Sequence, residues 1–449
     1  MLPPMLVGIA LFGANAMNLE QWKEKNNKCR RYAHFDVRVN LESVWPYISD
    51  PIRVEKHGFY PFIHYEKRLD KFDKSTGRIK KKSRHIFYSA HIDRYILQYY
   101  GFKLNQEYNR RVIIDGINDA AIAYRTNLHK NNIHFAKQAI DFIRATGNGY
   151  VVIGDFTEFF DSLDHIYLKT MLKNLLGVQN LSDDYYAIYK NIIHFSYWER
   201  DHLLEVNGLP QTRRGIKTLN EKDRVLSPEQ FRQLKRDNVH SGRNNGKGIP
   251  QGSAISAVFS NIYMLRFDKT MNDYVQNNKG LYLRYSDDFI LVLPKKSREE
   301  FSSHLTTIRE LINSIPNLVL QPDKTKIFEY SGSTVLSCNS DFLEDVGNDN
   351  ILNYLGFAFD GKIVTIRDKT LSKYYYRMYR KIKGITTCNG KTKSGKRIPL
   401  HKLYEKCSRK GKRNFITYAK RAESVFGHGE GISRGTKRHM QKIKRKLHP

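Results

Sequence analysis

Two adjacent aspartates, Asp287 and Asp288, stand inside an otherwise apolar stretch of the chain. Residues 281–283 precede them and residues 289–293 follow, and both runs have the aliphatic and aromatic character of buried strands. Asp is disfavoured in a strand interior, so the pair is predicted to lie at a tight turn between two strands. On these residues alone, a plain hairpin turn explains the pattern equally well.

A third acid, Asp155, closely follows the short apolar run Tyr150–Ile153. Functional groups are held most rigidly when regular strands carry them, so Asp155 is the natural partner of Asp287 and Asp288. Three converging carboxylates repel one another strongly unless cations neutralise them. Hard oxygen ligands select Mg²⁺, with Mn²⁺ as the alternative. Two such ions would stabilise both the attacking and the leaving oxygen of an in-line phosphoryl displacement.

A glycine-rich segment, Gly248–Gly252, precedes a run of small and then apolar residues. This pattern predicts a tight loop followed by a helix that begins near Ser253. Such a loop lets a nucleotide approach the backbone closely. Taken alone, it is only a turn before a helix.

The charge of the chain favours polyanionic partners. The net charge of the chain is +31. Residues 373–449 hold 24 Lys and Arg against three acids, so this segment carries about two thirds of the net charge. A field of this sign favours nucleic-acid binding. Apolar residues recur through the same tail, so we expect short helices with one buried and one basic side rather than a disordered tail.

The elements that position these residues are predicted as follows. Residues 18–150 are polar and aromatic with helical spacing, for example over Ile92–Leu104, and residues 197–247 form a polar, basic, exposed insertion. Ser297 is a suitable N-cap for an acidic helix that runs to Asn313.

The N-terminal residues and the cysteines indicate the cellular compartment in which the protein works. Residues 1–16 are apolar but lack the basic start of a signal peptide and are too short to span a membrane. We interpret them as an extension upstream of a start at Met17, in preference to a secretion signal. The four scattered cysteines contain no C-x-x-C pair, which argues against zinc and a disulfide framework. We therefore expect a cytoplasmic protein without a membrane segment.

The ordered segments together resemble the reverse transcriptase palm. The motifs, in chain order, are a fingers element at 80–94, a first palm motif at 155–165, I-P-Q-G at 249–252, Y-S-D-D at 285–288, a fourth motif at 318–326 and Y-L-G-F at 354–357. The similarity covers most of residues 80–370.

The resemblance implies an α+β right-hand polymerase. Fingers would occupy residues 17–148, the palm with an antiparallel sheet and flanking helices 149–366, and a helical basic thumb 367–449. The insertion at about 197–247 would belong to the palm.

The resemblance also implies site roles. Asp155 and Asp287 would ligate two Mg²⁺ ions, with Asp288 in support. Phe160 would exclude a ribose 2′-OH, although core packing explains a phenylalanine there as well. Gln251 and Gly252 would lie against the incoming nucleotide and the template.

Further roles follow for cations and for the last motif. Lys324 would assist the leaving pyrophosphate, and Arg84 would contact the triphosphate; ordinary surface residues are the alternative for both. The implied nucleic-acid contacts are Tyr354, Gly356, Lys373, Arg377 and Arg380.

The motif forms favour the prokaryotic branch of the family. Elimination of group II intron, retron and diversity-generating types leaves the abortive-infection and defence-associated enzymes. This implies deoxynucleotide substrates, an RNA template that can be a dedicated noncoding RNA, a DNA primer or product, and an antiphage role. A homo-oligomer is compatible with the sequence. Three alternatives stay open: untemplated or protein-primed DNA synthesis, RNA-directed RNA synthesis, and a non-catalytic RNA-binding scaffold.

Overall fold

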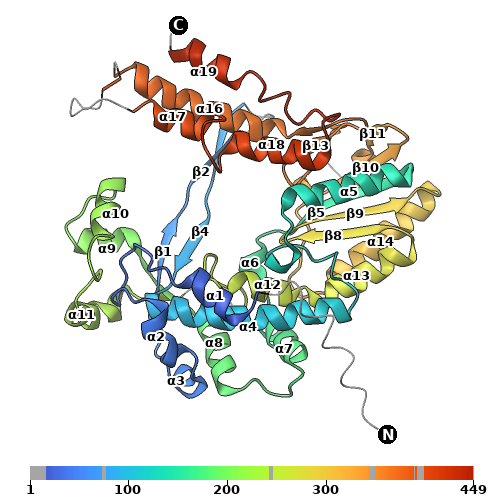
Figure 1. Cartoon of the computed structure of the whole chain (residues 1–449). Helices are drawn as coiled ribbons and strands as arrows, with labels where there is room; N and C mark the ends of the chain where they lie inside the picture. The colour runs from blue at the N-terminus through green and yellow to red at the C-terminus, as the bar shows by residue number, and fades with distance from the viewer. Residues whose placement is uncertain are drawn as a thin grey trace.

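The computed structural model describes residues 17–72, 77–241, 246–343, 349–388, 390–391 and 399–447. The predicted extension at residues 1–16 lies outside this part of the chain. Figure 1 shows the sheet that contains β5, β8 and β9 on the right, the helices α9–α11 on the left and the helices α16–α19 above them. Within the described residues, no helix combines the length and apolar character needed to cross a membrane.

The predicted palm is built on a five-stranded antiparallel sheet of order β11-β10-β5-β9-β8. Side chains alternate between its two faces, as the strand period requires. Tyr150 of β5 stacks on Phe301 of α14 with ring centroids 3.9 Å apart, whereas the next residue, Val151, packs in the cluster that contains Ile140 of α5. Figure 1 shows α5 over one face of the sheet and α13 and α14 over the other. The elements are α5 (Asn132–Thr146), β5 (Asn148–Asp155), α13 (Leu265–Asn277), β8 (Leu281–Tyr285), β9 (Asp288–Pro294), α14 (Arg298–Asn313), β10 (Lys326–Ser331) and β11 (Thr334–Ser337).

The acidic helix forms where the sequence predicts it. The Ser297 side chain accepts a hydrogen bond from the backbone N–H of Glu300, which satisfies one of the free donors at the helix start. The strand predicted at Tyr150–Ile153 is longer than this apolar run, since β5 begins at Asn148 and continues through Gly154 to Asp155.

The predicted fingers contain a four-stranded sheet of order β4-β1-β6-β7. The β6 strand runs parallel to β1, and Trp198 of β6 is fully buried. The segment 197–247, expected as an exposed insertion in the palm, thus supplies two strands to the fingers sheet and several core residues. The elements are α1 (Leu19–Asn26), α2 (Leu41–Ile48), α3 (Pro51–Glu55), β1 (Phe62–Glu66), β2 (Leu69–Phe72), β3 (Ile79–Lys82), β4 (His85–Tyr88), α4 (His91–Ile114), β6 (Ser196–Glu199), α9 (Arg200–Val206), α10 (Arg213–Leu219), α11 (Pro228–Asn238) and β7 (His240–Ser241).

Further helices and turns connect the elements of these sheets along the chain. The helix after the I-P-Q-G loop begins at Ser256, three residues later than predicted, because residues 251–255 continue the turn. These joining elements are the 3₁₀ turn η1 (Thr126–Leu128), α6 (Phe159–Ser162), α7 (His165–Leu176), α8 (Asp183–Ile193), α12 (Ser256–Tyr263), the 3₁₀ turn η2 (Pro322–Lys324) and α15 (Asn339–Phe342).

The basic C-terminal region is folded and helical. Met378 and Ile443 have no exposed surface and share one apolar cluster with residues of the intervening helices. This agrees with the apolar spacing of the tail. A small sheet precedes it: β12 (Leu352–Tyr354), β13 (Phe357–Phe359) and β14 (Val364–Ile366). The helices are α16 (Asp368–Thr386), α17 (His401–Cys407), α18 (Phe415–Phe426) and α19 (His439–Leu447).

Candidate active site

The three aspartates lie at one end of the palm sheet. Asp155 is the direct antiparallel partner of Asp288, and Asp287 sits in the two-residue turn between β8 and β9. The backbone N–H of Phe156 donates to the carbonyl of Asp287 over 3.1 Å, which ties the turn to β5. Ser286 adopts φ +63°, a left-handed conformation that tight hairpin turns require. The strand register therefore brings together the acids that the sequence selects.

The acids interact electrostatically. Burial, followed by the charges of Asp287 and Asp155, raises the pKa of Asp288 to about 7. Lys324 forms an ion pair with Asp155 Oδ1. The backbone also holds Lys324 close, because the N–H of Gln321 donates to the carbonyl of Asp155 over 2.8 Å. The fourth motif thus contacts the first.

The donor set suits a hard divalent cation. It offers only carboxylate oxygens, and burial together with the charges of Asp287 and Asp155 raises the pKa of Asp288, so a cation would stabilise its ionised form. Within the residues described, no three His, Cys, Asp or Glu side chains are already placed to hold a metal ion together. In this arrangement the Lys324 ammonium takes up one oxygen of Asp155. Metal binding through this oxygen would therefore require Lys324 to release Asp155.

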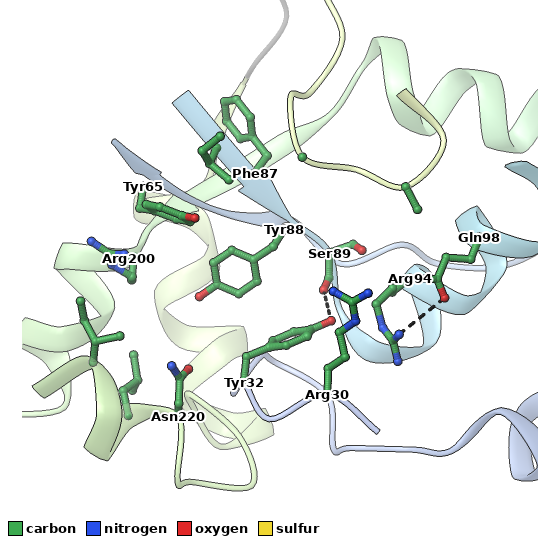
Figure 2. Close-up of a pocket in the computed structure, with 15 residues that line it drawn as sticks. Arg30, Tyr32, Tyr65, Phe87, Tyr88, Ser89, Arg94, Gln98, Arg200 and Asn220 are labelled. Carbon is green, nitrogen blue, oxygen red and sulfur yellow. Dashed lines mark hydrogen bonds between the residues drawn. The ribbon is translucent and has the colours of Figure 1, made fainter. Parts of the chain in front are cut away.

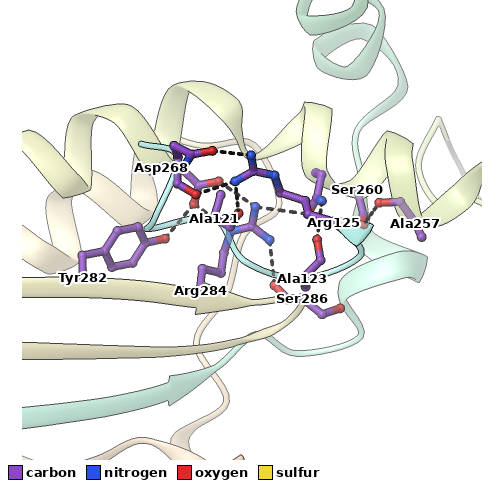
Figure 3. Close-up of polar contacts among 11 residues, drawn as sticks. Ala121, Ala123, Arg125, Ala257, Ser260, Asp268, Tyr282, Arg284 and Ser286 are labelled. Carbon is purple, nitrogen blue, oxygen red and sulfur yellow. Dashed lines mark hydrogen bonds and ion pairs between the residues drawn. The ribbon is translucent and has the colours of Figure 1, made fainter. Parts of the chain in front are cut away.

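A buried ion pair supports the turn from behind (Figure 3). The guanidinium of Arg284 donates to both oxygens of Asp268, over 2.7 and 2.6 Å, and neither side chain has any exposed surface. Its Nη1 also donates to the carbonyl of Ser286 over 2.9 Å. Burial disfavours the charged guanidinium, but the carboxylate of Asp268 outweighs it and raises the pKa of Arg284. The charged pair therefore persists and fixes the residue next to Asp287.

A second buried arginine orders the segment in front of the turn. Arg125 donates to the side chain of Asn109 over 2.8 Å and to the carbonyl of Ala121 over 3.0 Å. This segment presents Tyr124, whose hydroxyl lies 2.8 Å from the Ser286 hydroxyl. Tyr124 is 44% exposed, so the turn residue next to Asp287 is held by a side chain that also faces solvent.

The I-P-Q-G loop joins the first motif to the fingers. The N–H of Ile249 donates to the carbonyl of Phe160, and the N–H of Phe87 in β4 donates to the carbonyl of Gln251, each over 2.9 Å. Gly252 has φ +117°, and a Cβ there would lie 2.6 Å from the Phe87 carbonyl oxygen. Glycine is therefore required at this approach. Phe160 is half-buried, whereas the neighbouring Phe159 is a core residue.

The last motif forms a tight hairpin beside the acids. Tyr354 is 3% exposed, and burial together with the nearby charge of Asp288 raises its pKa. Gly356 adopts φ +94°. The side chain of Asn132 donates to the carbonyl of Leu355 over 3.0 Å and holds the hairpin against α5.

The predicted basic contacts are separated. Arg84 is exposed between β3 and β4, where its backbone pairs with Lys67. Lys373 and Arg377 line one hollow of the thumb, whereas Arg380 lines another. The structure thus brings the acids, Lys324 and the last motif together and ties the loop to Phe160. It places the predicted basic contacts on the surrounding surfaces.

Several residues of the site escaped sequence reasoning. Among them, only Arg284 could have been found from the sequence. It stands in an apolar strand, and a buried arginine requires a buried partner. The partner Asp268 and the supporting residues Arg125 and Tyr124 carry no comparable signal, because helix and loop residues of those types are ordinarily exposed.

Comparisons with known proteins were made against families, curated sequences and solved structures. The model of the reverse transcriptase (RNA-dependent DNA polymerase) family matches residues 109–359, more than half of the 449 residues. No curated protein sequence matches the chain.

Similar solved structures include telomerases. Apo telomerase from Candida tropicalis, truncated from its C-terminal domain, is 12% identical over 74% of this chain and 61% of that chain, with a TM-score of 0.42. Telomerase from Candida albicans in complex with the TWJ fragment of telomeric RNA is 12% identical over 96% of this chain and 68% of that chain, with a TM-score of 0.38. The chain thus spans about three fifths of the first of these structures. Sequence identities and TM-scores this low assign no activity or partner to the chain.

Proposed function

The chain belongs to the reverse transcriptase (RNA-dependent DNA polymerase) family, and on this premise we propose that it extends a 3′-OH with deoxynucleotides on an RNA template. The observation that carries the proposal is the register of β5 and β9, which sets Asp155 opposite Asp288 with Asp287 in the adjoining turn. The products would be elongated DNA and pyrophosphate.

Positioning and electrostatics would supply most of the catalysis. Asp155 and Asp287, supported by Asp288, would hold Mg²⁺ or Mn²⁺, which when bound stabilises the attacking and leaving oxygens of the phosphoryl transfer. Arg284 keeps the turn fixed through the Ser286 carbonyl, so Asp287 needs no rearrangement during the reaction. Lys324, once released from Asp155, would offer its ammonium to the leaving pyrophosphate.

Two residues would select and hold the incoming nucleotide. Phe160 is partly exposed beside the I-P-Q-G loop and would collide with a ribose 2′-OH. Gly252 lets the loop pack directly against β4, because any side chain there would strike the Phe87 carbonyl, and this contact would fix the loop against which the nucleotide and the template lie. The fingers and the thumb would hold the template and primer through their excess of Lys and Arg.

The finer assignment follows from the motif forms in the sequence. We place the protein among the prokaryotic defence-associated reverse transcriptases, acting in the cytoplasm on a dedicated noncoding RNA during antiphage defence. The I-P-Q-G and F-F-D-S-L-D-H forms support the branch. The large positive charge supports a stable RNA partner.

Sequencing of the reaction products tests this proposal. The purified protein would be incubated with Mg²⁺ and labelled dNTPs, with its co-purifying RNA retained or removed by ribonuclease and replaced by a primed RNA of known sequence. We expect DNA complementary to the RNA present. DNA unrelated to any RNA would instead assign the enzyme to untemplated or protein-primed synthesis. Incorporation of ribonucleotides in preference would assign it to RNA synthesis, and absence of product with RNA bound would leave a binding scaffold.

A further inference from the structure

The turn of the last motif has an unusual backbone conformation. Leu355 has φ +44° and Gly356 has φ +94°, so two successive residues lie in the left-handed region. This region favours glycine, and a leucine persists there only where surrounding groups fix the backbone. Both residues are partly exposed, whereas Tyr354 before them and Phe357 after them are buried. The turn therefore needs support from outside its own hairpin.

Asn132, the first residue of α5, supplies this support. Its side-chain amide donates to the carbonyl of Leu355 and to the hydroxyl of Tyr418 in α18, each over 3.0 Å. A Cβ added at Gly356 would lie 3.9 Å from both the Asn132 amide nitrogen and the Tyr418 oxygen, so the two groups lie directly against the turn. An amide has two N–H donors, and this one commits both to joining the turn and α18.

The helix α18 packs into two apolar cores. Ala419, Ala422 and Phe426 belong to the cluster that also contains residues of α5, β8 and β9. The ring of Phe426 lies 4.8 Å from that of Phe357, which directly follows the turn. Near the start of the helix, Ile416 belongs instead to the cluster that contains residues of α16, α17 and α19. The helix therefore joins the core of the palm sheet to the core of the C-terminal helices.

An ion pair fixes the segment that follows α18. Glu430 accepts from Nη1 of Arg144, near the end of α5, over 2.7 Å. The second oxygen of Glu430 accepts from the backbone N–H of Val364 over 2.6 Å, and Arg144 also donates to the carbonyl of Lys362 over 2.7 Å. The Glu430 side chain is only 12% exposed, so water screens this pair little. Contacts near both ends of α5 thus hold α18 and the residues after it.

We propose that Asn132 and Tyr418 are positioning residues, which hold the turn at Leu355 and Gly356 where it aligns the primer 3′-OH with the catalytic aspartates. The primer as the group that contacts this turn rests on the proposed function. The turn lies near the acids, because the buried Tyr354 that precedes it is within reach of the charge of Asp288. The rate of nucleotide addition, rather than the affinity for the duplex, should then depend on both side chains.

Single-turnover addition of one deoxynucleotide separates positioning from binding. A DNA primer on an RNA template is mixed with excess protein, and Mg²⁺ starts the reaction. We expect the rate constant at saturating nucleotide to fall about tenfold in Asn132→Ala, because a small displacement of the reacting groups lowers the rate steeply. The Kd for the primed template, measured in EDTA, should match that of the wild type. An unchanged rate constant would overturn the proposal.

Tyr418→Phe tests the same contact by removing a single oxygen atom. The ring stays in place, so this variant keeps the test open if thermal unfolding shows that Asn132→Ala does not fold. We expect its rate constant to fall about threefold, since Asn132 keeps its bond to Leu355. The double variant should be no slower than Asn132→Ala alone, because both changes act through one turn. Losses that multiply in the double variant would contradict this shared action.

A matched control and a second readout distinguish positioning from stability. Tyr376→Phe removes the hydroxyl of a tyrosine on α16 that is 63% exposed, and it should match the wild type. Hydrogen exchange of peptides that cover residues 352–359 should be about tenfold faster in Asn132→Ala than in the wild type, while peptides from β5 exchange alike. Faster exchange with an unchanged rate constant would show a purely structural contact and would overturn the positioning role.

The outcomes also separate this inference from the proposed function. If the wild type adds no nucleotide, the proposed function fails, and the positioning role fails with it. If the wild type adds nucleotides and both variants add them at the same rate, only the positioning role fails. A slower rate constant in both variants, with wild-type affinity for the primed template, supports both.

Discussion

Arg284 and Asp268 form an ion pair with no exposed surface directly behind the turn that carries Asp287. Breaking a buried pair leaves one charge without compensation, which typically costs about 3–5 kcal/mol. We predict that Asp268→Asn lowers the free energy of unfolding by about this amount, measured by denaturant titration. Asp141→Asn, which breaks the exposed pair with Lys137, should cost no more than about 1 kcal/mol. A similar, small cost for both variants would contradict the structural role of the pair.

The raised pKa of Asp288 predicts a pH-dependent stability in the metal-free protein. The folded state holds this proton up to about pH 7, whereas the unfolded chain releases it near the ordinary value of 3.8. Stability should therefore fall as pH rises from about 4 to 7, by up to about 4 kcal/mol relative to Asp288→Asn. Mg²⁺ should offset this loss most strongly above pH 7. Denaturant titrations at several pH values, with EDTA or Mg²⁺, check the difference, and parallel curves for the two proteins would refute it.

The ion pair of Lys324 with Asp155 predicts competition with divalent cations. Lys324→Met should tighten Mg²⁺ binding, by up to about fivefold for a partly exposed pair. The same variant should slow nucleotide addition, because the leaving pyrophosphate loses a cation. The shift of thermal unfolding with Mg²⁺ concentration measures the first effect, with Lys326→Met as the control. Weaker Mg²⁺ binding in Lys324→Met would show that the ammonium assists rather than opposes the metal.

Phe160 predicts the choice of sugar. Phe160→Ala should raise the use of ribonucleotides relative to deoxynucleotides by about tenfold, measured by single-nucleotide extension with each substrate. The adjacent core residue gives a matched comparison: Phe159→Leu should reduce stability and leave the ratio unchanged. If the ratio does not move in Phe160→Ala, the ring is a packing residue and sugar selection lies elsewhere.

The sequence predicts the positions where short-range physical rules dominate. The N-cap at Ser297 needs only its own side chain and the next turn, and α14 begins there. Apolar runs likewise locate β8, β9 and the turn between them, but only Asp287 lies in that turn, because Asp288 is already the first residue of β9 and pairs with Tyr285.

Tertiary features are harder to predict. The polar composition of residues 197–247 indicates an exposed insertion, yet Trp198 and Leu203 are buried in the fingers core. A few apolar residues are enough to bury this segment, because β1 supplies the strand against which β6 pairs. A pocket in the fingers, with Arg94 among its lining residues, joins segments that lie far apart in the chain, so no local pattern marks it (Figure 2). Similarly, Lys324 meets Asp155 only because β10 pairs with β5.

Single-nucleotide extension of a DNA primer on an RNA template, compared between the wild type and Asp287→Asn, tests the central claim most directly. Both proteins should bind the primed template equally in EDTA. With Mg²⁺, we expect the rate of addition by Asp287→Asn to fall at least about a thousandfold, because the charge that stabilises the transferring phosphoryl group is lost. Asp141→Asn, an exposed change on α5, should match the wild type. Extension by Asp287→Asn at the wild-type rate would contradict the assignment of these aspartates as the catalytic centre.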